Sequence, residues 1–111
     1  MSMIHNNSHF NIVAESKNGY VSVCECCYQY SFSFNNLLLV FGEEQMLNFF
    51  EWLMAYRYSR ENYVSLPGGR DHIYSSPHTN LFLVYNDEEL DEISALFAEV
   101  QLALEVRKIL K

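Results

Sequence analysis

The 111-residue chain is 50% hydrophobic, which excludes a disordered tail and predicts a single domain, 1–111, with a buried core. Its net charge of −7 argues against nucleic-acid binding, which relies on clustered Lys and Arg. No apolar run approaches the roughly 18 residues of a membrane span, and the first ten residues lack the basic and apolar regions of a secretory signal. We therefore expect a cytoplasmic protein with no membrane or nucleic-acid partner.

The first predicted element is a hairpin over residues 10–24, because two apolar stretches flank an Asn18-Gly19 pair that favours a tight turn. A strand is predicted over Tyr28–Phe34, where large apolar and polar residues alternate. The continuous apolar run Leu37–Phe41 predicts a more deeply buried strand. Short turns between these strands favour antiparallel pairing.

Three cysteines, Cys24, Cys26 and Cys27, interrupt this series of strands. Their odd number and the lack of a secretory signal favour reduced thiols over a disulfide framework. The parity of the apolar positions changes here, which predicts a knuckle turn that resets the face of the strand. Cys24 and Cys27 form a C-x-x-C pair whose two thiolates can converge on one zinc ion.

Zinc binding is one of two main interpretations of these cysteines. A structural zinc site needs four ligands, and the chain has no second C-x-x-C. We expect His5 or His9 to complete the site if the N-terminal strand pairs beside the knuckle. The alternative is a β-bulge whose small buried thiols pack as hydrophobic side chains. A thioredoxin-type redox pair is disfavoured, because that motif begins a helix.

An internal repeat organises the rest of the chain. Residues 36–44 align with residues 80–88 at an offset of 44, without gaps. The two halves, about 28–58 and 72–102, each predict strand, turn, strand and helix. Both helices have the same start signal, a residue that favours the N-cap position followed three positions later by Gln or Glu: Gly42 with Gln45, and Asn86 with Glu89.

The two predicted helices run from about Glu43 to Arg57 and from about Asp87 to Leu110. Each has an apolar stripe at helical spacing. At 1.5 Å per residue the second helix would be ~36 Å long, which exceeds the ~17–20 Å of a typical strand. Its last turns also have apolar residues away from the buried stripe. This surplus predicts an interface with another copy of the chain through Leu102, Val106 and Ile109.

The segment between the two halves, about 58–72, contains Pro67-Gly68-Gly69 and is expected to form a surface loop. Tyr56, Arg57 and Tyr58 lie at its start and favour a protein–protein contact, because Tyr and Arg are enriched at interfaces. The chain has no nucleophile-elbow motif. The carboxylates cluster in first helical turns, where they complement the helix dipole.

The order of motifs resembles a family of short bacterial proteins of unknown function. The resemblance rests on Asn18-Gly19-Tyr20, on the C-x-x-C pair, on Phe34–Phe41 with the Phe-rich helix that follows, and on Asn80–Tyr85. It covers residues 18–105 and implies a bacterial cytosolic setting, without an activity to transfer. The family's C-x-x-C corresponds to Cys24 and Cys27, and the additional Cys26 departs from its pattern.

Together these patterns predict an α+β fold: an antiparallel sheet of five or six strands with two helices on one face, in a pseudo-symmetric ββα–ββα arrangement. The leading functional hypothesis is a non-catalytic binding or assembly module that forms a homodimer. The alternative is a small zinc-binding domain that uses Cys24 and Cys27. A small enzyme with a site near the 58–72 loop is a third hypothesis, for which the sequence assigns no catalytic roles.

Overall fold

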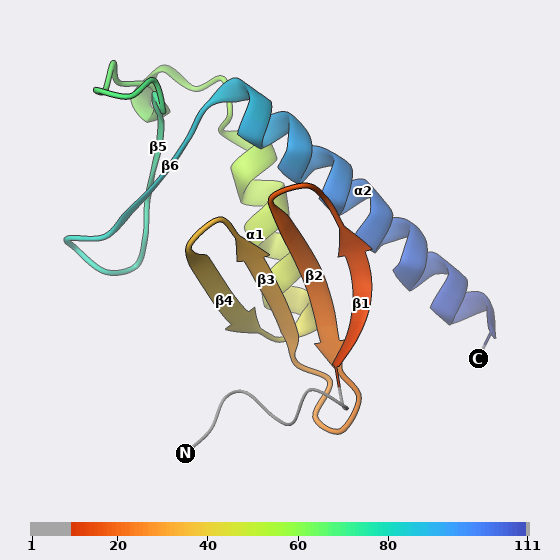
Figure 1. The fold of residues 1–111 in the computed structure, drawn as a ribbon. Helices are drawn as coiled ribbons and strands as arrows, with labels where there is room; N and C mark the ends of the chain where they lie inside the picture. Colours follow the sequence, from red (N-terminus) through yellow and green to blue (C-terminus); the bar gives the residue numbers. More distant parts are fainter. Residues whose placement is uncertain (1–9, 111) are drawn as a thin grey trace.

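The structure is a computed structural model that describes residues 10–110. It contains six strands and two long helices in the order β-β-β-β-α-β-β-α (Figure 1), which confirms the predicted α+β class. The elements are β1 (Phe10–Glu15), β2 (Gly19–Cys24), β3 (Tyr30–Phe34), β4 (Leu37–Phe41), α1 (Glu43–Ala55), the short 3-10 helix η2 (Arg60–Asn62), β5 (His72–Ser75), β6 (Phe82–Tyr85) and α2 (Asp87–Leu110).

The first four strands form one antiparallel sheet in the order β1-β2-β3-β4. Val21 lies opposite Phe32, which lies opposite Leu39, so these side chains share one face of the sheet. Gly19, the first residue of β2, has no room for a side chain beside β3, because a Cβ there would lie 2.3 Å from the backbone oxygen of Ser33. The hairpin predicted over residues 10–24 is therefore present as β1 and β2.

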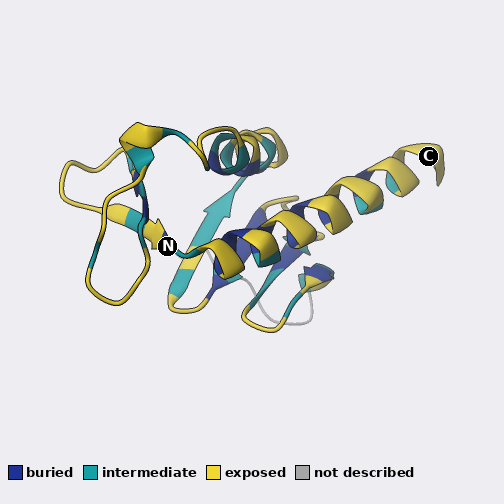
Figure 2. Cartoon of the chain, turned by 90° about the horizontal axis from the view of Figure 1, so that it is seen from above, coloured by how far each residue is buried: buried dark blue, intermediate teal, exposed yellow. Residues whose placement is uncertain are grey.

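Both helices lie on one side of this sheet and bury a common core against it (Figure 2). The ring centroids of Phe32 and Phe50 are 5.0 Å apart, and those of Phe50 and Phe97 are 5.2 Å apart, so one aromatic stack joins the sheet, α1 and α2. The helices bury apolar stripes at helical spacing, Met46, Phe50 and Leu53 in α1 and Leu90, Ile93, Phe97, Val100 and Leu104 in α2, and α2 also buries Leu96 and Glu89. Phe49 is only partly buried. The prediction that Leu37–Phe41 is the more deeply buried strand is wrong, because no residue of β4 is buried, whereas four of the five residues of β3 are.

The last two strands differ from the prediction of one sheet of five or six strands. β5 and β6 form a two-stranded sheet of their own, and no ladder links them to β4 in residues 10–110. The hairpin attaches through side chains instead. The ring of Tyr74 packs on Trp52, and its hydroxyl donates to the carbonyl of Leu53 at 2.7 Å. Tyr85 packs against Phe34. These aromatic contacts, rather than strand pairing, join the hairpin to the larger sheet and α1.

The element order strand-strand-helix occurs twice, as β3-β4-α1 and as β5-β6-α2. The two hairpins lie in different sheets, so the repeat remains a prediction. The helix starts follow the capping signals. The backbone N–H of Glu89 donates to Oδ1 of Asn86 at 2.8 Å, and the N–H of Asn86 donates to Oε1 of Glu89 at 2.9 Å. At α1, Gly42 N–H donates to Gln45.

Two boundaries differ from those expected from the sequence. α1 ends at Ala55 rather than at Arg57. β3 begins at Tyr30 rather than at Tyr28, because Tyr28 has a left-handed backbone with φ 56° and belongs to the preceding turn. None of the helices within the described residues is both long enough and apolar enough to cross a membrane.

Candidate functional site

The three cysteines lie in the turn that joins β2 to β3. The turn is closed by two backbone hydrogen bonds, from Cys24 N–H to the carbonyl of Gln29 at 2.8 Å and from Tyr28 N–H to the carbonyl of Cys24 at 2.7 Å. The left-handed conformation of Tyr28 reverses the chain. This is the predicted knuckle turn. The bulge alternative fits only Cys24, the last residue of β2, which is buried; Cys26 and Cys27 lie in the turn that follows and are exposed.

The turn brings the three sulfurs into one cluster. All three Sγ atoms lie within 4.8 Å of one another, and those of Cys24 and Cys26 are 3.1 Å apart. Cys24 is buried. Thiolates that share a metal ion at ~2.3 Å lie roughly 4 Å apart, so small side-chain adjustments would suffice for ligation. The three residues, which we term the cysteine cluster, could therefore hold a metal ion.

The pKa values of two thiols in the cluster are shifted in opposite directions. Burial disfavours a charged Cys24, yet hydrogen bonds from Cys26 and Cys27 lower the pKa of the Cys24 thiol below its ordinary value. The same hydrogen bond, with burial and the neighbouring charge, raises the pKa of Cys26 to about 11. Metal ligation requires thiolates, so binding of an ion would release protons from the cluster.

The predicted zinc ligands are Cys24, Cys27, His5 and His9, and the structure describes only the two cysteines among them. His5 and His9 lie outside the described residues, so their proposed role remains a prediction. Cys24 and Cys27 are brought together as predicted, and Cys26 joins them as a third donor. The prediction left Cys26 out because it considered only the C-x-x-C pair. The signal that could have found it is the string Cys24-Glu25-Cys26-Cys27, because a turn over these residues allows all three sulfurs to lie on one side.

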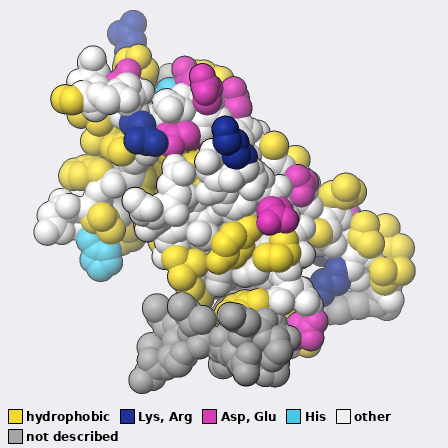
Figure 3. All heavy atoms as spheres, in the orientation of Figure 1, with side chains coloured by type: hydrophobic (Ala, Val, Ile, Leu, Met, Phe, Trp, Pro, Cys, Tyr) yellow, Lys and Arg dark blue, Asp and Glu magenta, His cyan; other side chains and the backbone are white. Residues whose placement is uncertain are grey.

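The end of α2 presents a second candidate surface. α2 extends beyond the sheet, and hydrophobic side chains gather at its C-terminal end (Figure 3). Leu102, Val106 and Ile109 are 66%, 47% and 79% exposed. Leu102 and Val106 each follow a buried residue, Val100 or Leu104, by two positions, or about 200° around the helix. α2 therefore has an exposed apolar stripe opposite its buried one, at the three predicted interface positions.

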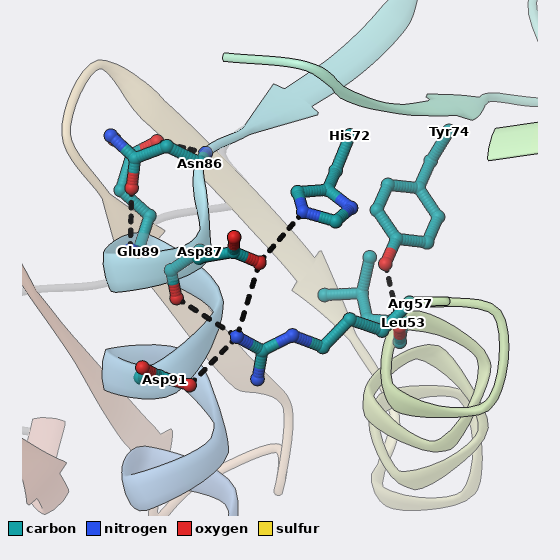
Figure 4. Close-up of polar contacts among 8 residues, drawn as sticks. All are labelled: Leu53, Arg57, His72, Tyr74, Asn86, Asp87, Glu89 and Asp91. Atoms are coloured by element: carbon teal, nitrogen blue, oxygen red, sulfur yellow. Dashed lines mark hydrogen bonds and ion pairs between the residues drawn. The ribbon is translucent and has the colours of Figure 1, made fainter. Parts of the chain in front are cut away.

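A polar cluster joins β5, the turn that follows α1, and α2 near the 58–72 loop (Figure 4). His72 Nε2 lies 2.8 Å from Oδ1 of Asp87. Arg57 donates to the backbone carbonyl of Asp87 at 3.0 Å and forms an ion pair with Asp91 at 2.7 Å. His72 and Asp87 are distant in sequence, but the β5–β6 register pairs His72 with Tyr85 and so brings the imidazole beside the start of α2.

These polar groups line the concave site that the enzyme hypothesis requires. A pocket of about 410 Å³ is bordered by the polar cluster and by the segment that follows α1; its lining residues are Arg57, Tyr58, Ser59, Arg60, Tyr63, His72 and Asp87. Nε2 of His72 is hydrogen-bonded to Oδ1 of Asp87, so Nδ1 is the ring nitrogen left for any other contact. That nitrogen is buried and has no hydrogen-bond partner within the described residues.

Electrostatics in this polar cluster also favour a structural role. The hydrogen bond from His72, opposed by desolvation and helped by Arg57, lowers the pKa of Asp87. Asp91 and Asp87 raise the pKa of Arg57 despite its burial. Asp87 and Arg57 thus each stabilise the charged form of the other. Of the predicted contact residues in this region, Tyr56 and Tyr58 are exposed, whereas the side chain of Arg57 is only 11% exposed and faces the carboxylates.

Comparison with known proteins gives a family but no activity. The model of a family of unknown function, DUF6686, matches residues 5–111, and the chain belongs to this family. No curated protein matches the chain. A search of solved structures likewise gives no match. The expected membership of a family of unknown function is confirmed, and any function has to be inferred from the described residues.

Proposed function

Starting from membership of a family without an assigned activity, we propose that this protein is a non-catalytic domain that binds a metal ion through its cysteine cluster. The observation that carries this proposal is the convergence of three sulfurs within 4.8 Å, two of them on exposed residues. Thiolates are strong ligands for zinc and for other soft ions. Zinc is the first ion to test, because the C-x-x-C pair is typical of zinc knuckles.

The position of the cluster in the fold supports this proposal. A buried cysteine that serves only as a small hydrophobic residue does not need neighbouring sulfurs. Here Cys24 is 1% exposed, whereas Cys26 and Cys27 extend into solvent beside it. Two backbone hydrogen bonds fix the turn before any ion is bound. A site that is already formed loses less conformational entropy on binding. Reduced thiols of this kind also fit a cytoplasmic location.

The direct experiment is to measure bound metal after purification without chelator and after reconstitution with zinc under reducing conditions. We expect about one equivalent of metal in the wild type and near-complete loss in the triple variant C24S/C26S/C27S. Glu25→Gln is the matched control, because it changes a carboxylate in the same turn and leaves the sulfurs in place. Equal metal content in the wild type and the triple variant would overturn the proposal.

A second candidate function is self-association, and the exposed stripe of α2 favours it. Small residues extend this stripe toward the middle of the helix, where Ala95 and Ala98 are exposed at the same helical face as Leu102. Small residues allow helices to approach closely, and larger apolar residues at the end supply buried area. We propose a homodimer in which α2 of one copy packs on α2 of the other.

Sedimentation of Leu102→Glu and Val106→Glu tests this second candidate. We expect the wild type to sediment as a dimer at micromolar concentration and each variant as a folded monomer, because a charge in the stripe disfavours burial. Gln101→Glu adds the same charge to an exposed position beside the stripe and should leave the dimer intact. A wild type that remains monomeric at high micromolar concentration would contradict the dimer.

A further inference from the structure

The donor set of the cysteine cluster contains sulfur only. Among the described residues, no histidine or carboxylate joins the group formed by Cys24, Cys26 and Cys27. The nearest acidic side chain, Glu25, is hydrogen-bonded to Asn11 on β1. The amide oxygen of Gln29 lies 3.8 Å from Sγ of Cys27 and is a neutral, hard donor. The turn therefore provides three soft ligands from a stretch of four residues.

The number and kind of these ligands distinguish between metal ions. Zinc in structural protein sites takes four ligands in tetrahedral geometry, so it would require a fourth donor. Soft thiolates select monovalent copper, zinc and iron–sulfur clusters. Of these, copper(I) is the ion that three sulfurs can satisfy without a nitrogen or oxygen ligand. An iron–sulfur cluster is held by four ligands from the protein.

We propose that the cysteine cluster is a three-sulfur site for monovalent copper, complete without His5 and His9. This inference rests on the proposed metal-binding function and names its ion. Binding involves no change of oxidation state: copper enters as copper(I), each coordinating thiol releases its proton to the buffer, and three copper–sulfur bonds form. Cys24 forms the buried side of the site, and the exposed Cys26 and Cys27 form the side from which the ion enters.

The test is an anaerobic titration of the reduced protein with copper(I) in competition with bathocuproine disulfonate, paired with a zinc titration in which we expect zinc to bind more weakly than copper(I), because it lacks a fourth protein ligand. We expect one copper per chain and an X-ray absorption spectrum that shows three sulfur neighbours. Cys26→Ser should weaken copper binding by more than the roughly 10- to 100-fold cost of losing a supporting group, because it removes a ligand. The double variant H5A/H9A should bind copper as the wild type does.

The outcomes separate this inference from the proposal on which it rests. One equivalent of zinc, bound more tightly than copper and lost in H5A/H9A, would overturn the copper site and leave metal binding in place. Copper binding that depends on the histidines, or a spectrum with nitrogen neighbours, would overturn it as well. A protein that takes up neither ion would overturn both. Circular dichroism of each variant shows whether the fold is retained.

Discussion

The cysteine cluster and the polar cluster bring reactive side chains together in different ways. At the polar cluster, His72 and Arg57 both contact Asp87, and these contacts join β5, the turn after α1, and α2. Nδ1 of His72 is buried. At the cysteine cluster, two of the three side chains are exposed on a turn that backbone hydrogen bonds already close.

This difference shows that convergence of titratable groups is not enough to indicate a functional site. The polar cluster has a pocket and shifted pKa values, which are common features of active sites. Its contacts nevertheless serve to hold elements together. The cysteine cluster has donor atoms that solvent, and therefore an ion, can reach. The following predictions separate a structural cluster from a ligand-binding one, beginning with the largest expected effect on stability.

Asp87→Ala should have the largest effect of these changes. It removes the acceptor of the nearly buried His72 and one partner of Arg57, whose side chains are 6% and 11% exposed. We expect the free energy of unfolding to fall by more than in any variant below, because the buried side chains of His72 and Arg57 lose their acceptor. Urea denaturation measures this change. Glu88→Ala, at the next exposed position of the same helix turn, is the control and should change stability by less than about 0.5 kcal/mol.

Metal uptake by Asp87→Ala should equal that of the wild type, since the polar cluster and the cysteine cluster share no residue. A loss of metal in this variant, with the fold retained, would show that the two clusters do not act separately.

Lowering the pH should weaken the contacts of the polar cluster and leave the turn that holds the cysteine cluster unchanged. The folded protein lowers the pKa of Asp87, chiefly through the hydrogen bond from His72. A lowered pKa contributes stability that is complete above the unfolded-state value, ~3.9, and is lost as the pH falls through the folded-state value. The slope of stability against pH below about pH 4 should therefore be smaller in Asp87→Ala than in the wild type. Identical slopes would refute this assignment, and Cys26→Ser should keep the wild-type slope.

Cys26→Ser should have the smallest effect on the stability of the metal-free protein, less than about 0.5 kcal/mol. Cys26 is exposed, and the hydrogen bonds that close the turn come from the backbone. Thermal unfolding in the presence of a chelator measures this. A large destabilisation of the metal-free protein would indicate that the sulfurs support the fold rather than bind an ion.

Local patterns in the sequence predicted most of the fold. The bounds of β4 and α2, the knuckle turn and the helix starts follow from period-2 alternation, apolar runs and capping residues, all of which act over a few neighbouring residues. The separate β5–β6 sheet could not be predicted in this way. It depends on how Tyr74 and Tyr85 pack on residues far along the chain, Trp52 and Phe34.

The candidate sites were likewise predictable only where their residues are close in sequence. Cys24 and Cys27 are close in sequence, so their convergence was predictable, and only the choice of a two-sulfur pattern excluded Cys26. The contact between His72 and Asp87 depends on the register of a hairpin with a long connection. No spacing rule in the sequence identifies such a pair. The burial of Nδ1 of His72 is likewise a property of the tertiary structure that no local sequence pattern shows.

The central claim is that the cysteine cluster binds a metal ion and the polar cluster does not. The most direct measurement is the metal content per chain, by elemental analysis under reducing conditions, of the wild type, C24S/C26S/C27S and Asp87→Ala. We predict about one equivalent in the wild type and in Asp87→Ala, and almost none in the cysteine variant. Metal that remains in the cysteine variant, or a wild type that binds none, would contradict the account.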